Sequence, residues 1–106
     1  MRCSVWWGLT LGVLLSGGVS PKAEAQERAE RLDEARQLFV EGQTAFQRGS
    51  LHDALQLLLA AEKLVPSAEL AYNIGHLYDL IGEPEEAARF LHLYLSRSRE
   101  PTPDRE

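Results

Sequence analysis

A 33-residue repeat constrains this chain more than any other feature of its sequence, because the stretch that begins at Ala68 repeats the stretch from Ala35 to Ser67. The matched positions hold glycine, alanine or another apolar residue in both copies: Gly42 with Gly75, Ala45 with Tyr78, Gly49 with Gly82, Ala54 with Ala87, Leu58 with Leu91 and Ala61 with Tyr94. A period of about 20 to 50 residues is typical of solenoid repeats. We therefore expect two copies of one unit, each a helix, a glycine turn and a second helix.

Apolar spacing and helix-stopping residues predict four helices, over residues 26–48, 51–64, 68–81 and 84–97. Apolar residues of the first recur three and four positions apart, the period of one helical face; they are Ala29, Leu32, Ala35, Phe39, Gly42 and Phe46. Gly49, Pro66 and Gly82 are expected to end the first three helices. The predicted fold class is all-α, with two helix-turn-helix hairpins.

Serine and proline mark the expected helix starts. Ser50 with Asp53 resembles a capping box at the start of the second helix. Ser67 is expected to cap the third helix, and Pro84 suits the first turn of the fourth. Glu85 stands four residues before Arg89, a spacing that favours an ion pair on the helix surface.

Residues 1–25 have the pattern of a secretory signal peptide. Arg2 gives a positive start, residues 5–15 are mostly apolar, and Ala23-Glu24-Ala25 ends the segment with small residues. We expect cleavage after Ala25 and a periplasmic or secreted product. The alternative is an uncleaved anchor, although the apolar run is shorter than the roughly 20 residues that span a bilayer.

Cleavage would leave a helical domain of residues 26–97 without cysteine, because Cys3 is the only cysteine of the chain. The domain would then depend on burial alone, with no disulfide. Residues 98–106 hold Pro101 and Pro103 among charged residues, so we expect a disordered tail. A proline-containing peptide ligand is the alternative for this tail.

The second copy carries a recognisable run: residues 71–78 read Ala-Tyr-Asn-Ile-Gly-His-Leu-Tyr, followed by Gly82, Ala87 and Leu91. This run resembles the tetratricopeptide repeat, whose signature includes L-G-x2-Y and a later alanine. The first copy departs from that pattern at Glu41 and Ala45. It matches through Leu38, Gly42, Gly49, Ala54, Ala61 and Pro66. Ankyrin repeats share the period of 33, but their T-P-L-H-x-A motif is absent from this sequence.

The resemblance covers residues 35–99, as units of about 35–67 and 68–99, and it is strongest to small exported bacterial proteins with two such repeats. It implies a short right-handed α-solenoid. Small residues would lie where the helices of a unit cross and let the backbones approach closely. These residues are Gly42, Ala54, Gly75 and Ala87.

The same resemblance implies a concave face, lined by the first helix of each unit, that holds a partner peptide or protein. The first unit would contribute Arg36, Phe39, Gln43 and Phe46, and the second Glu69, Tyr72, Asn73, His76 and Asp79. Aromatic side chains would anchor the partner, and polar ones would bind its backbone or a charged end. The alternative reading is that Phe39 and Phe46 belong to the core and that Asn73 is only the consensus asparagine.

Other function classes find little support in the sequence. The net charge is −5 with acidic residues spread along the chain, which argues against nucleic acid and, after signal cleavage, against a membrane surface. His76 and Asp79 share a helix face but lack further metal ligands nearby. We find no catalytic motif, so we expect a non-enzyme with no metal and no cofactor.

The last predicted helix raises the question of self-association. His92, Arg97 and Ser98 stand where the first copy has Leu59, Leu64 and Val65, as suits a helix that faces water. The same helix keeps Phe90, Leu93, Tyr94 and Leu95, which is more apolar surface than a terminal helix should expose. We expect a second copy or a partner to cover this face. The alternative function is therefore a self-assembling structural subunit that dimerises through its last helix.

Overall fold

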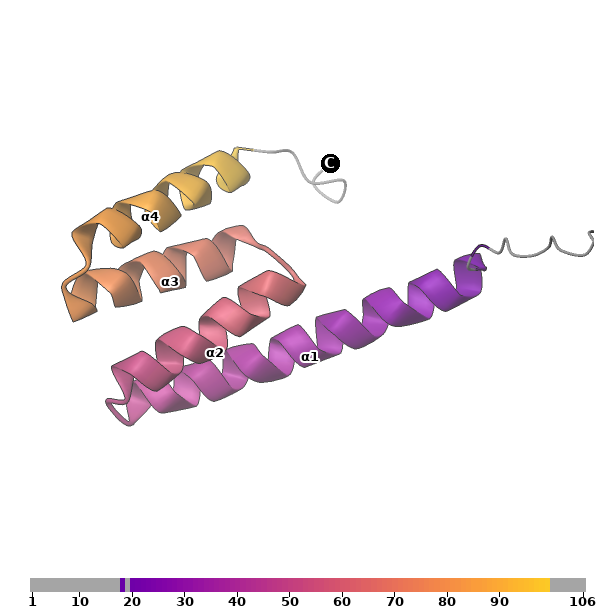
Figure 1. Ribbon diagram of the computed structural model, residues 1–106, viewed down its shortest axis with the longest axis horizontal. Coiled ribbons are helices and arrows are strands. Elements are labelled where there is room, and N and C mark those ends of the chain that lie inside the picture. The colour runs from indigo at the N-terminus through magenta and orange to yellow at the C-terminus, as the bar shows by residue number, and fades with distance from the viewer. Residues whose placement is uncertain (1–17, 19, 100–106) are drawn as a thin grey trace, which may run out of the picture.

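The computed structural model describes Gly18 and residues 20–99, and within this part of the chain four α-helices form. They are α1 (Pro21–Gln47), α2 (Leu51–Leu64), α3 (Ala68–Ile81) and α4 (Pro84–Ser98) (Figure 1). The expected all-α class is confirmed, and α2 and α3 have the predicted bounds. Most of the predicted signal peptide and tail lies outside the described residues.

The helices pack as two hairpins, α1 against α2 and α3 against α4, with lesser contact between α2 and α3 (Figure 1). α1 has 27 residues and α2 has 14, so the N-terminal part of α1 extends beyond the hairpin. The first buried side chain of α1 is Ala35. Residues 21–34 of α1 therefore add length to the helix without entering the core.

The two hairpin turns have the same backbone geometry, 33 residues apart. Gly49 and Gly82 have φ of 83° and 95°, the left-handed region in which a side chain is strained. The next residue then donates its N–H back into the preceding helix: Ser50 to the carbonyl of Ala45 at 2.9 Å, and Glu83 to that of Tyr78 at 2.8 Å. The sequence repeat is therefore also a repeat of hydrogen bonding.

One of the two expected serine caps is present and the other is not. The Ser67 hydroxyl accepts a hydrogen bond from the Leu70 N–H at 3.0 Å, as predicted. Ser50 makes no such bond, so the predicted capping box is wrong. Ser67 is extended, with ψ of 161°, whereas the tight turn holds Ser50 at ψ of 75°. That conformation does not aim the hydroxyl at the start of α2.

The glycines at the helix crossings allow close approach, as expected. A Cβ on Gly42 would lie 2.8 Å from Cδ2 of Leu58, and one on Gly75 would lie 3.0 Å from Cδ2 of Leu91. Ala54 and Ala87 contribute the next contacts, because their carbonyl oxygens lie 3.5 and 3.3 Å from those positions. Gly42 and Gly75 therefore lie where the two helices of each hairpin approach most closely to a leucine of the partner helix.

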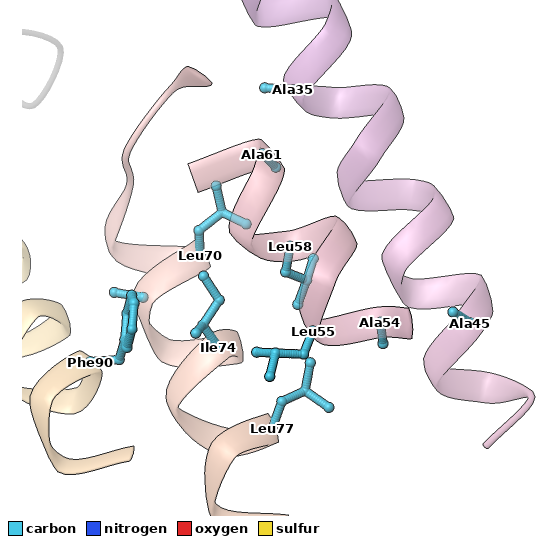
Figure 2. Packing of buried hydrophobic residues seen from close by; sticks show 11 residues of the cluster. Ala35, Ala45, Ala54, Leu55, Leu58, Ala61, Leu70, Ile74, Leu77 and Phe90 are labelled. Atoms are coloured by element: carbon cyan, nitrogen blue, oxygen red, sulfur yellow. The ribbon is translucent and has the colours of Figure 1, made fainter. Parts of the chain in front are cut away.

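The core runs through both hairpins and is made of apolar side chains. Figure 2 shows Leu55 of α2 turned toward Ile74 and Leu77 of α3, with Phe90 of α4 on the other side of α3. Ile74, at 0 % exposure, is the largest fully buried side chain. Helix α3 is thus packed from both sides, which is what joins the two hairpins.

Two ionic contacts differ from the sequence expectations. Arg97, expected to face water, has Nη2 2.8 Å from the Glu62 carboxylate and donates from Nη1 to the Ser67 carbonyl at 2.9 Å. Arg89 pairs at 2.6 Å with Glu86 rather than with Glu85, and its guanidinium also lies over the Phe90 ring, 4.5 Å from the ring centroid. The hydrogen bond to Glu86 raises the pKa of Arg89 above its usual value.

Candidate functional site

A groove lies between α1 and α3, and one of its two pockets has a volume of about 280 Å³. Gln43, Phe46 and Gln47 line it from α1, and Asn73 and His76 line it from α3. Leu58 and Leu77, which are 4 % and 2 % exposed, supply buried apolar contacts within it. The site thus combines an apolar interior with amide and imidazole groups on facing helices.

A second pocket of about 380 Å³ lies between earlier turns of the same two helices. Arg36, Phe39 and Val40 line it from α1, and Glu69 and Leu70 line it from α3. Because residues three and four apart lie on one helix face, the two pockets follow the same side of α1. We call them together the α1–α3 groove.

Most of the residues expected to bind a partner line this groove. Gln43, Phe46, Asn73 and His76 line the first pocket, and Arg36, Phe39 and Glu69 line the second. Tyr72 and Asp79 line neither pocket. The exposed Tyr72 ring instead stacks on His76 at 6.5 Å between centroids and meets the edge of Tyr94 at 5.2 Å. Tyr72 therefore braces α3 against α4 beside the groove.

The two phenylalanines, for which both a core and a groove reading were open, have different environments. Phe39 is half-buried and packs against the core cluster, while Phe46 is 41 % exposed. A large aromatic ring that stays this exposed beside an apolar pocket is available as an anchor for a partner. Phe46 is thus the stronger candidate of the two.

Sequence reasoning missed several groove residues. Leu32 and Val40, which are 38 % and 58 % exposed, line the second pocket. Their four-residue spacing on either side of Arg36 places all three on one stripe of α1, a signal that could have found them. Leu80, at 48 % exposure, follows His76 by four residues on the same side of α3 but lines neither pocket.

The charged groups at the groove are exposed and weakly engaged. Arg36 lies 3.7 Å from Asp33, and both side chains are more than two-thirds exposed, so this pair adds little to stability.

Within residues 20–99, no three His, Cys, Asp or Glu side chains cluster in a way that could hold a metal ion. No helix in this same part of the chain is long and apolar enough to cross a bilayer.

The expected apolar face of the last helix is not one surface. Phe90 is only 5 % exposed and its ring stacks on Tyr78 at 5.7 Å, so the expectation that it faces outward is wrong. Leu93 and Tyr94 are half-buried against the core, and of the four residues only Leu95 is exposed, at 48 %. Phe90 is buried because it lies on the side of α4 that packs against α3.

Comparisons with family models, with curated proteins and with solved structures found no significant match.

Proposed function

We propose that this protein is an interaction module of two tetratricopeptide-like units that binds a peptide segment of a partner protein in the α1–α3 groove. The observation that carries the proposal is the exposed Phe46 ring beside a pocket with a Leu58 and Leu77 interior and amide side chains on both helices. Such a mixture of apolar depth and a few polar groups is typical of ligand sites. The proposal assigns binding and no catalytic step.

The polar groups suit a peptide backbone. Gln43 on α1 and Asn73 on α3 each carry an amide that can both donate and accept hydrogen bonds, as a peptide unit requires. The apolar pocket between them could take one large side chain of the partner. The stripe from Leu32 to Gln47 is about 22 Å long at the helical rise, which matches roughly six or seven extended residues.

The tetratricopeptide-like assignment is supported by a spacing of 33 residues between equivalent features. These features are the turns and the glycine–leucine contacts where the helices of each hairpin cross. We include export in the proposal because of the signal-like pattern of residues 1–25. α1 begins at Pro21, so cleavage after Ala25 would remove its first five residues. None of the five is buried, so the core that starts at Ala35 would keep its contacts. N-terminal sequencing of the accumulated protein tests the cleavage.

Selection of peptides from a random display library tests the binding proposal. We expect enrichment of peptides with a large apolar residue, and we would measure one synthetic peptide by fluorescence anisotropy. Phe46→Ala should weaken its binding about tenfold or more, as for a central aromatic anchor, and Asn73→Ala should also weaken it. Leu95→Ala, outside the groove, should leave the affinity unchanged. No enrichment, or equal affinity for wild type and Phe46→Ala, would overturn the proposal.

A further inference from the structure

The outward side of α4 repeats the side by which α2 holds α3. Leu55 and Leu58 of α2 are 5 % and 4 % exposed, because α3 packs on that side of α2 and Leu58 also meets Gly42 of α1. The equivalent positions 33 residues later are Ala88 and Leu91. Ala88 is exposed, and Leu91, which meets Gly75 of α3 on one side, is still 36 % exposed because no helix among the described residues covers the outward side of α4.

Leu95 extends this uncovered stripe. It follows Leu91 by four residues and Ala88 by seven, so the three lie on one helical face. Its equivalent in α2 is Glu62, which forms an ion pair with Arg97. A salt-bridged carboxylate in the first hairpin is thus replaced by an apolar side chain that is 48 % exposed in the second. We call Ala88, Leu91 and Leu95 the outer face of α4.

We propose that a second copy of this chain covers the outer face of α4, with the two α4 helices packed antiparallel about a two-fold axis. The charges at the ends of α4 argue for this occupant. Glu85 is exposed in its first turn and Arg99 is exposed at its end. An antiparallel pair centred near Leu91 brings Glu85 of each copy toward Arg99 of the other and places Ala88 opposite Leu95.

Head-to-tail stacking of copies is the less favourable arrangement. It would bring α1 of one copy onto α4 of the next, in the way α3 packs onto α2. The large α3 side chains of the core are Leu70, Ile74 and Leu77, and their equivalents in α1 are Gln37, Glu41 and Thr44, all exposed. Burying Glu41 against Leu91 and Leu95 would strip a carboxylate of water without a partner. An isologous α4 pair avoids this.

A single pair of helices buries less area than a standard interface, so we expect weak, concentration-dependent dimers. Sedimentation velocity tests this dimerisation. It is measured from micromolar to millimolar concentration on the protein in the form purified from its host. Leu95→Glu should raise the dimer dissociation constant about tenfold or more, because it places carboxylates in the apolar contact. Leu80→Glu is the matched control, since Leu80 has the same 48 % exposure but lies on α3.

Charge reversal tests the antiparallel register. Glu85→Arg and Arg99→Glu should each weaken the dimer several-fold, and the double variant should restore it, because opposite charges again face each other across the pair. A wild-type monomer at all concentrations would overturn the proposal and leave the face to a different partner. Dimers insensitive to Leu95→Glu, or no recovery in the double variant, would also overturn it. Circular dichroism of each variant checks folding, and peptide binding in the groove is measured separately.

Discussion

Arg97 of α4 and Glu62 of α2 form an ion pair at 2.8 Å between helices that belong to different hairpins. The two side chains are 24 % and 14 % exposed, and Glu62 also accepts a hydrogen bond from the Ser67 N–H at 3.4 Å. Arg97 donates to the Ser67 carbonyl as well. The three residues thus connect the end of α2, the linker and the end of α4.

Replacement of Arg97 by Ala should destabilise the fold more than its position near the end of the last helix suggests. We expect a loss of about 1 to 2 kcal/mol in the free energy of unfolding, because Glu62 stays partly buried without its charged partner. Urea denaturation followed by circular dichroism measures the loss. Arg89→Ala is the control: its pair with Glu86 is 58 % and 42 % exposed and should contribute less than about 0.5 kcal/mol. Equal effects of the two changes would contradict this account.

Alanine at the two crossing glycines should have unequal effects. Ala is the better helix former by about 1 kcal/mol, but a Cβ at Gly42 collides with Leu58, which α3 holds in place at 4 % exposure. Leu91 opposite Gly75 is 36 % exposed and can move toward solvent. We expect Gly42→Ala to destabilise by about 1 to 2 kcal/mol and Gly75→Ala to be nearly neutral in thermal unfolding. The reverse order would show that Leu91 is as confined as Leu58.

The two serines before helices offer a matched test of capping. Ser67→Ala should cost about 1 kcal/mol because it removes the acceptor for the Leu70 N–H. Ser50→Ala should change the free energy of unfolding by no more than about 0.3 kcal/mol, since Ser50 makes no side-chain cap bond. Chemical denaturation of both variants under the same conditions decides the point. A substantial loss for Ser50→Ala would mean that the capping box forms in solution after all.

A comparison of alanine substitutions at Phe90 and Leu95 distinguishes the buried side of α4 from its exposed side. Phe90→Ala should destabilise by about 3 to 5 kcal/mol, because it leaves a cavity beside Tyr78 within the core cluster. Leu95→Ala, measured below the concentration at which copies associate, should cost less than about 0.5 kcal/mol. Thermal unfolding monitored by circular dichroism compares the two. Similar losses would indicate that Leu95 is also covered within a single chain.

Much of the candidate groove could be predicted because it rests on helix periodicity. Arg36, Phe39, Gln43 and Phe46 recur three and four residues apart, so any packing of that helix keeps them on one side. Helix periodicity could not predict which of these residues line a pocket and which lie on the open surface. Tyr72 does not line the groove, because its ring packs against Tyr94. Tyr94 becomes a neighbour only when α3 packs on α4.

The sequence by itself determined the repeat, the bounds of α2 and α3, the left-handed turns at Gly49 and Gly82 and the small residues at the crossings. These features depend on hydrogen bonds within a few residues and on the steric needs of single backbone positions, which residue type and spacing encode directly. Only the tertiary structure decided that Phe90 is buried, that Arg97 binds Glu62 and that Leu91 is less covered than Leu58. Those outcomes depend on which helix surface meets which neighbour. The contacts between Phe90 and Tyr78 and between Arg97 and Glu62 join different helices, so they are set by packing rather than by local pattern.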